Sequence, residues 1–149
     1  MDYLIVAHPD DEVVFFNPEN YDKIIIVFMD RLDSKEITEG RHRVKKLHPL
    51  KDKITWLEFQ ESNFWRDERM EVIYKGQYSN LCFVLSKIND ATSVTTHAFN
   101  GEYGHADHVL VHKAVVDTFD KNIVKFGDIS IKEKIKELYK NEGCWTWKN

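Results

Sequence analysis

The most constraining feature of this chain is a set of short apolar runs that lack polar alternation. Residues 3–6 and 23–29 are such runs, and the second is rich in β-branched side chains. Continuous apolar runs of this length are typical of strands buried on both faces, as in a parallel sheet covered by helices. Further strands are predicted at residues 54–59, 93–98 and 123–126. The sequence therefore predicts a mostly parallel sheet of about five strands.

Helical segments are predicted between these strands. A short helix or turn is expected over residues 13–16, and longer helices at 40–47, 78–88, from Asp107 to about Phe119, and 131–139. Strands that alternate with helices indicate right-handed crossovers, so we expect a single Rossmann-like three-layer α/β sandwich spanning residues 1–149. No G-x-G-x-x-G follows the first strand, so a dinucleotide is not expected.

Two clusters of histidine and acidic residues follow predicted strands. The clusters are Ala7-His8-Pro9-Asp10-Asp11-Glu12, after the first strand, and Gly101-Glu102-Tyr103-Gly104-His105-Ala106-Asp107-His108, after the fourth. Pro9 has no N–H to donate and ends the strand ladder. Both clusters are therefore expected at the carboxyl edge of the sheet, where open α/β sheets bind ligands. Taken alone, the first cluster is also typical of a helix start, whose dipole the acids complement.

Together, the two clusters resemble the motifs of the LmbE/PIG-L family of zinc-dependent N-deacetylases. The order and separation of the motifs make the resemblance specific, and it extends over nearly the whole chain. At the tail, Asp128-Ile129-Ser130 and the Lys-rich helix after them are similar to the closing segment of the family. The resemblance implies a Rossmann-like fold and a metal-dependent amide hydrolase.

The resemblance implies that His8, Asp11 and His108 bind the metal ion. Catalytic zinc usually takes three protein ligands and leaves one position for water, whose pKa the ion lowers from 15.7 to about 7. Zinc is the expected cofactor, and ferrous iron would also suit these ligands. Asp10 cannot easily share the ion with Asp11, so we expect it to act as the general base.

Three residues of the second cluster are expected to assist catalysis. His105 is the candidate that protonates the leaving amine and stabilises the oxyanion, provided that it is protonated. A nearby carboxylate raises the pKa of an imidazole, and we expect Asp107 to do this for His105 and to orient its ring. Tyr103 matches a family tyrosine that approaches the oxyanion; the alternative is a tyrosine that packs the loop.

Substrate contacts are predicted on two other segments. The resemblance implies that Arg41 or Arg43 contacts a substrate hydroxyl, although the basic run is also typical of a solvated helix face. Glu61 matches an acid that contacts hydroxyls in relatives, and a surface acid is the alternative. Phe64 and Trp65 are expected either to stack on a sugar or to cover the core.

The remaining histidines receive separate predictions. His97 is expected to support a metal ligand from behind. His112 lies four residues after His108, but the pattern lacks the Glu of His-Glu-x-x-His, so a zincin site is not expected. His42 and His48 are expected at the surface.

Composition limits the partners of the chain. The net charge is −4, from 21 basic and 25 acidic residues, which argues against a general nucleic-acid surface. Cys82 and Cys144 form no Cys-x-x-Cys pair and are expected as free thiols in a reducing compartment. No apolar run approaches about 18 residues, and the first strand starts at residue 3, so we expect a soluble cytoplasmic protein without a membrane span. A homo-oligomer is compatible with the sequence.

The predicted function is zinc-dependent removal of acetate from an N-acetylated amino sugar or its conjugate. One alternative is amide hydrolysis on another acyl amine, such as a thiol conjugate or a modified nucleoside. The other is a non-catalytic sugar- or nucleotide-binding relative. That alternative rests on the short chain and on a closing segment that departs from the family pattern at Asn141-Glu142-Gly143-Cys144-Trp145.

Overall fold

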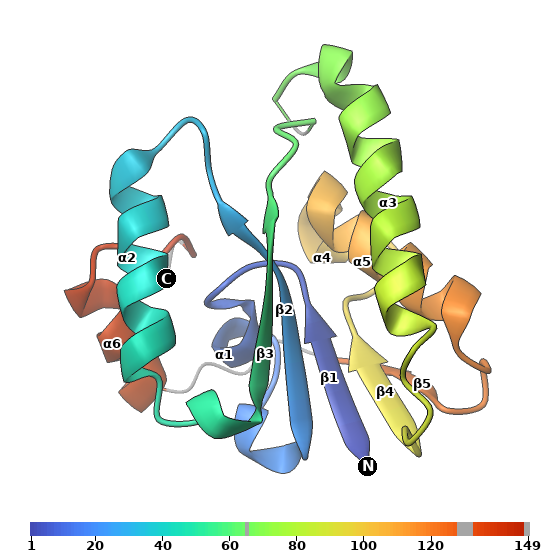
Figure 1. Ribbon diagram of the computed structural model, residues 1–149. Coiled ribbons are helices and arrows are strands. Elements are labelled where there is room, and N and C mark those ends of the chain that lie inside the picture. The colour runs from blue at the N-terminus through green and yellow to red at the C-terminus, as the bar shows by residue number, and fades with distance from the viewer. Residues whose placement is uncertain (65, 128–132, 148–149) are drawn as a thin grey trace.

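The fold is a five-stranded parallel sheet with helices on both faces, as predicted (Figure 1). The computed structural model describes residues 1–64, 66–127 and 133–147. In the order β3-β2-β1-β4-β5, the strands are β3 (Ile54–Gln60), β2 (Lys23–Asp30), β1 (Asp2–Val6), β4 (Ser93–Thr96) and β5 (Val124–Phe126). Every neighbouring pair is parallel.

Six α-helices and three short 3-10 turns are described in the covered ranges. The helices are α1 (Asp11–Val14), α2 (Lys35–Leu47), α3 (Glu71–Leu85), α4 (Gly101–Gly104), α5 (Ala106–Thr118) and α6 (Glu133–Asn141). The turns are η1 (Pro18–Asn20), η2 (Lys51–Lys53) and η3 (Glu68–Met70). Helices α1, α2 and α6 lie on one side of the sheet, and α3 and α5 lie on the other (Figure 1).

The central strand β1 is buried on both faces, as its unbroken apolar run predicts. Tyr3 and Ile5 pack in a core cluster with residues of α3 and α5, whereas Leu4 and Val6 pack on the opposite face with Phe15. Successive side chains of a strand point to opposite faces, so an apolar residue is needed at each position here.

Two helices begin earlier than predicted. Helix α2 starts at Lys35 rather than at residue 40, because the Ser34 hydroxyl accepts a hydrogen bond from Ile37 N at 3.2 Å and caps the helix. Helix α3 starts at Glu71 rather than at residue 78. Three predictions lie outside the described residues: the role of Trp65, the segment 128–130 and the start of the last helix at 131–132.

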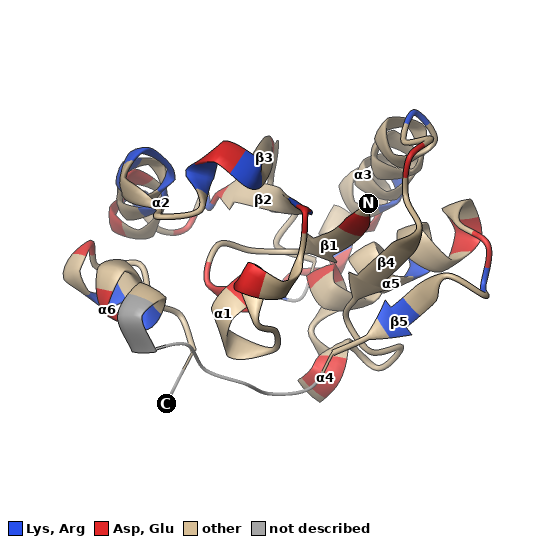
Figure 2. Cartoon of the chain, turned by 90° about the horizontal axis from the view of Figure 1, so that it is seen from below, with Lys and Arg blue, Asp and Glu red and all other residues tan. Residues whose placement is uncertain are grey.

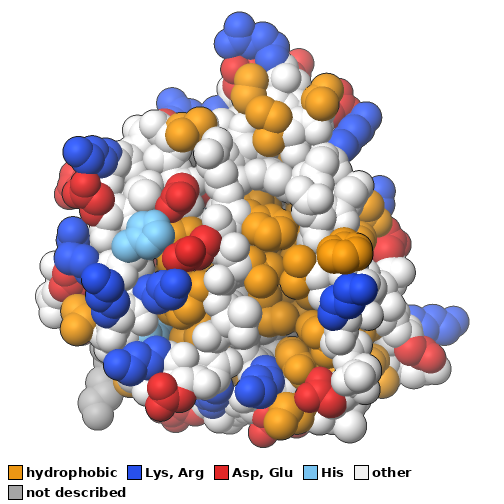
Figure 3. Space-filling model, in the orientation of Figure 1, with side chains coloured by type: hydrophobic (Ala, Val, Ile, Leu, Met, Phe, Trp, Pro, Cys, Tyr) orange, Lys and Arg blue, Asp and Glu red, His pale blue; other side chains and the backbone are white. Residues whose placement is uncertain are grey.

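Charged residues of both signs are mixed over the surface. Seen from below, helices α2 and α6 each carry both basic and acidic residues (Figure 2). On the face drawn in Figure 3, Lys and Arg side chains lie interspersed with Asp and Glu. No helix in the described part of the chain is long and apolar enough to cross a membrane.

Strand β1 is the central strand of the sheet, and the chain order changes direction there. It pairs with β2 on one side and with β4 on the other, and the chain then continues outward in each direction. The segments that leave the carboxyl ends of β1 and β4 therefore emerge side by side at a topological switch point, where ligands of open α/β sheets bind. These are the two predicted motif segments.

Candidate metal centre and active site

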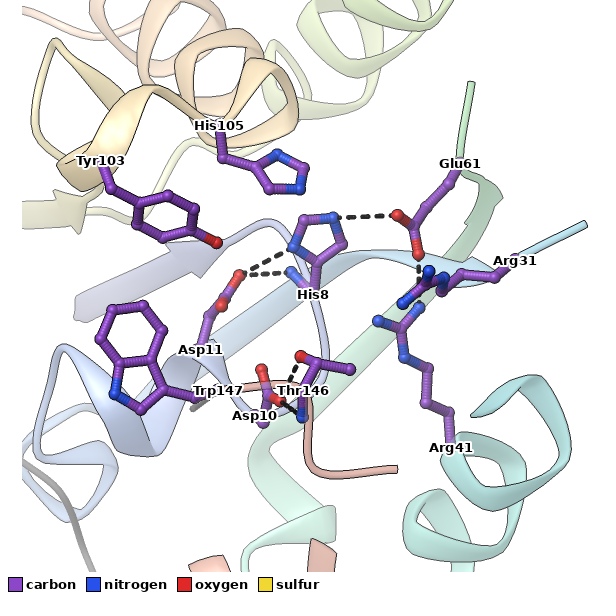
Figure 4. A pocket seen from close by; sticks show the side chains of 10 residues that line it. All are labelled: His8, Asp10, Asp11, Arg31, Arg41, Glu61, Tyr103, His105, Thr146 and Trp147. Atoms are coloured by element: carbon purple, nitrogen blue, oxygen red, sulfur yellow. Dashed lines mark hydrogen bonds and ion pairs between the residues drawn. The ribbon is translucent and has the colours of Figure 1, made fainter. Parts of the chain in front are cut away.

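A cavity of about 330 Å³ opens at this edge of the sheet (Figure 4). Its walls come from both motifs, from the residues that directly follow β2 and β3, from α2 and from the C-terminal segment. The lining residues are His8, Asp10, Asp11, Arg31, Arg41, Glu61, Tyr103, His105, Thr146 and Trp147.

The three predicted metal ligands converge on one point. Nδ1 of His8 and Nε2 of His108 each lie 3.2 Å from Oδ2 of Asp11. One ligand atom from each of the three residues falls within 4.8 Å of the other two, and all three residues are buried. A tetrahedral zinc site with bonds of 2.0–2.1 Å separates its ligand atoms by about 3.3 Å. The spacing of these donor atoms therefore suits a metal ion.

The outer nitrogens of both imidazoles face carboxylates. Nε2 of His8 lies 2.8 Å from Oδ2 of Asp107, and Nδ1 of His108 lies 3.0 Å from Oε1 of Glu102. A ring N–H that donates to a carboxylate leaves the other nitrogen with its lone pair, which orients a metal ligand. Nε2 of His108 is buried and, although it lies 3.2 Å from Oδ2 of Asp11, makes no hydrogen bond to any described residue. These buried His and Asp residues can hold a metal ion.

The charges at this point stabilise one another in the folded chain. Burial opposes ionisation of Asp11, but the imidazoles of His108 and His8 hold its pKa well below the usual range. Burial also lowers the pKa of His108, and Asp11 and Glu102 overcome this to raise it to about 9. Asp11 and the two imidazoles therefore stabilise one another's charged forms.

Asp10 sits in the tight turn between β1 and α1. Its backbone has φ 97, a left-handed conformation that is uncommon for a residue with a side chain. Its N–H donates to Oε1 of Glu12 at 2.9 Å, and the carboxylate faces the cavity (Figure 4). Burial and the neighbouring charge of Asp11 raise the pKa of Asp10 to about 8. A carboxylate with this pKa can both accept and release a proton near neutral pH.

The predicted partnership between His105 and Asp107 is not the one observed. The carboxylate of Asp107 bonds to His8, whereas Nδ1 of His105 accepts a hydrogen bond from the backbone N–H of Asp107 at 3.1 Å. Burial and the nearby positive charges of His8 and His108 lower the pKa of His105 to about 3, opposite to the predicted direction. A neutral His105 whose Nδ1 accepts carries its proton on Nε2.

Three further predicted residues, Tyr103, Arg41 and Glu61, line the cavity. Tyr103 lines the cavity, with its ring 5.5 Å from that of Trp147. Arg41 and Glu61 are both buried in the cavity wall, and Nη1 of Arg41 donates to Glu61 at 2.6 Å. Glu61 is therefore not a surface acid.

Arg43 is not part of the cavity wall. It is exposed on the outer side of α2 and pairs with Glu142 at 2.8 Å. Residues two apart on a helix point in different directions, so only one of the two arginines can enter the site. Of the two predicted arginines, Arg41 lines the cavity and Arg43 does not, and the contact to substrate stays a prediction.

The other histidines differ partly from expectation. His97 lies behind the ligands as predicted: its Nδ1 is 2.9 Å from Glu102, and its Nε2 accepts from Ala7 N at 3.0 Å. His42 is half-buried and pairs with Asp30. The prediction of a surface position for His48 is wrong, because it is buried with Nε2 3.1 Å from Glu12.

Several functional residues were not predicted from the sequence. Glu102 bonds to both His97 and His108, and its φ of 65 is a strained conformation of the kind found at functional sites. Arg31 also lines the cavity, and so do Thr146 and Trp147 from the far end of the chain. For Glu102, the available sequence signal was an acidic side chain close to two histidines in a turn. Thr146 and Trp147 carried no such signal.

Comparisons with known proteins add one distant relative. No family model matches the chain. An uncharacterized protein of Acanthamoeba polyphaga mimivirus is 26% identical over 148 aligned residues, covering 83% of this chain. The chain spans only 60% of the length of that viral protein. The similarity to LmbE/PIG-L deacetylases therefore stays a prediction from the motifs.

Proposed function

We propose that the chain is a zinc-dependent N-deacetylase that releases acetate from an N-acetylated amino sugar or its conjugate. The observation that carries the proposal is the convergence of His8, Asp11 and His108 on one point. Two of these residues, His8 and Asp11, line the cavity together with Asp10. Two imidazoles and one carboxylate are a common ligand set of catalytic zinc. A bound ion would supply Lewis acidity, which polarises the amide carbonyl and lowers the pKa of water.

Asp10 is the proposed proton carrier. It accepts a proton from the attacking water as the water oxygen bonds to the carbonyl carbon. It then delivers that proton to the nitrogen as the C–N bond breaks, so acetate and the free amine are released. The carboxyl group of Asp10 lines the cavity in which both proton transfers would take place.

His105 and Tyr103 are the proposed stabilisers of the oxyanion. Because Nδ1 of His105 accepts from the backbone, the ring proton lies on Nε2, and His105 lines the cavity. A bound cation would keep His105 neutral, as the nearby imidazoles already do. The Tyr103 phenol is neutral as well, because burial raises its pKa well above the usual value. Both groups can therefore donate a hydrogen bond to a developing negative charge.

Arg41 and Glu61 are the proposed contacts to substrate hydroxyls. Oε2 of Glu61 accepts a hydrogen bond from Arg41, and Oε1 of Glu61 lies 3.4 Å from Nε2 of His8. Each carboxylate oxygen has a second lone pair that can accept a hydrogen bond from a ligand. The cavity volume of about 330 Å³ is near the lower end of the usual range for small-molecule sites, about 300–1,000 Å³. A small N-acetyl sugar fits this scale. The two free cysteines agree with the reducing, cytoplasmic location that forms part of the proposal.

Metal analysis joined to a substrate screen tests the proposal. We expect about one zinc per chain and release of acetate from at least one member of a panel of N-acetylated sugars and conjugates. Asp10→Asn should retain the metal and lose acetate release, because an amide cannot accept the proton. Thr55→Val, on the exposed side of β3, is the control and should retain both. A zinc-loaded protein that hydrolyses no N-acetyl compound would refute the proposed activity.

A further inference from the structure

The carboxylate of Asp10 is held by a residue near the other end of the chain. Oδ2 of Asp10 accepts two hydrogen bonds from Thr146, one from the backbone N at 2.7 Å and one from Oγ1 at 2.6 Å. Figure 4 shows both contacts on the same oxygen, with the second carboxylate oxygen turned away from Thr146. Asp10 and Thr146 both line the cavity.

Packing that does not involve Asp10 fixes the position of this segment. Gly40 of α2 has no side chain, and a Cβ there would come within 2.4 Å of the Glu142 carbonyl oxygen. Cys144 is fully buried in the core cluster between α2 and α6. Trp147 packs its ring edge against Phe15, with centroids 5.2 Å apart. The tail therefore reaches Asp10 along a defined path.

The backbone N–H of Asp10 is held by Glu12, and Glu12 is in turn held by the helix that leads into the tail. Oε1 of Glu12 accepts from Asp10 N, while Oε2 accepts from the Tyr139 hydroxyl at 2.7 Å. Tyr139 belongs to α6, which leads into the tail. The strained φ of 97 at Asp10 persists only where surrounding contacts over-determine it. Helix α6 and the tail together supply such contacts.

We propose that Thr146 is a positioning residue for Asp10 and that the C-terminal segment 142–147 completes the active site. Two hydrogen bonds to one oxygen prevent rotation of the carboxylate and keep the other oxygen directed into the cavity. A proton acceptor must be held in the correct orientation to act in the transition state. This inference rests on the proposed function, in which Asp10 carries the proton.

The kinetic test compares two substitutions of Thr146. Thr146→Val removes the hydroxyl and keeps the shape, so kcat should fall about 10- to 100-fold, with KM and zinc content unchanged. Thr146→Ser keeps the hydroxyl and should restore kcat to within about threefold of the wild type. Thr55→Val makes the same chemical change at an exposed position outside the cavity and serves as the control. Unchanged kcat in Thr146→Val, or a KM effect without a kcat effect, would overturn the inference.

A second measurement does not require activity. Thr146 is exposed, so its amide should exchange rapidly with solvent unless the bond to Asp10 protects it. We expect measurable protection in the wild type and at least a tenfold faster exchange in Asp10→Ala. The amide of Cys144, which donates to Tyr139 O at 3.1 Å, should keep its protection in both proteins.

The two readouts separate failure of the inference from failure of the proposed function. If the wild type hydrolyses nothing but Asp10→Ala releases the Thr146 amide, the contact stands and the deacetylase proposal fails. If Thr146 exchanges equally fast in both proteins, the contact does not form in solution and the inference is wrong.

Discussion

The carboxylate of Asp107 lies directly behind His8, with Oδ2 of Asp107 2.8 Å from Nε2 of His8. Asp107 belongs to α5 and His8 follows β1, so this contact joins the two motif segments. Together with the bond from His108 to Glu102, it gives each predicted histidine ligand its own carboxylate. We therefore propose that Asp107 orients His8 as a metal ligand rather than raising the pKa of His105.

Asp107→Asn should weaken zinc binding about 10- to 100-fold, because an amide is a weaker acceptor for the His8 N–H than a carboxylate. Competition with a fluorescent chelator measures the affinity. Asp52→Asn, the same change at an exposed position, should leave it unaltered. Equal zinc affinity in the Asp107 variant and the wild type would remove Asp107 from this role.

Arg41 and Arg69 provide a matched pair, because Arg41 lines the cavity and Arg69 is exposed outside it. Arg41→Lys should lower kcat/KM at least about tenfold, because an ammonium group does not reproduce the guanidinium contacts to Glu61 and the Met29 carbonyl. Arg69→Lys makes the same change outside the cavity and should leave kcat/KM within about twofold. Steady-state kinetics on the best N-acetyl substrate provides the comparison. A similar loss in both variants would contradict the placement of Arg41 in the substrate site.

The fold and the meeting of the two motifs were predictable because they depend on strong local signals, whereas the choice of His8, Asp11 and His108 came from the family resemblance. Unbroken apolar runs identified the buried parallel strands, such as residues 23–29 for β2. Since parallel strands end at the same edge, the motif after β1 and the motif after β4 had to meet there. Neither inference required knowledge of side-chain packing.

The partners of individual polar groups were not predictable in this way. His48 looks like a surface residue beside a proline, but the fold buries it against Glu12. Asp107 lies two residues from His105 in sequence, but its side chain points to His8. Thr146 contacts Asp10 across 136 positions, and its approach depends on the close packing at Gly40. Burial by distant elements decided each of these contacts.

The Tyr139 hydroxyl is expected to stabilise the folded chain. Tyr139→Phe removes its hydrogen bond to the buried carboxylate of Glu12, which retains the contact to His48. The free energy of unfolding should fall by about 1–3 kcal/mol, the usual cost of depriving a buried charged acceptor of a partner. Urea denaturation measures the difference, with Tyr21→Phe as the control outside this network. A loss below about 0.5 kcal/mol would show that the network does not stabilise the fold.

Alkaline pH should destabilise the protein, because a buried thiol and a buried phenol hold their protons more tightly in the folded chain than in the unfolded chain. Burial raises the pKa of Cys144 from 9.0 to about 12, and burial and Glu12 raise the pKa of Tyr139 well above 10.0. The unfolded chain therefore loses these protons at lower pH than the folded chain. The stabilisation is complete below pH 9.0 and declines as the pH rises toward about 12.

Urea denaturation between pH 8 and about 11 checks this expectation. The free energy of unfolding should decline above pH 9, and the decline should be shallower in Cys144→Ala, which lacks the thiol. Identical slopes in the two proteins would show that the thiol does not contribute to the decline.

Zinc binding by His8, Asp11 and His108 can be tested by anomalous diffraction at the zinc absorption edge, on crystals of the zinc-loaded protein. We expect one peak per chain, bonded to Nδ1 of His8, Nε2 of His108 and a carboxylate oxygen of Asp11, with Asp10 unbonded beside it. A peak at any other group of residues, or no peak at this cluster in saturating zinc, would refute zinc binding by these three residues.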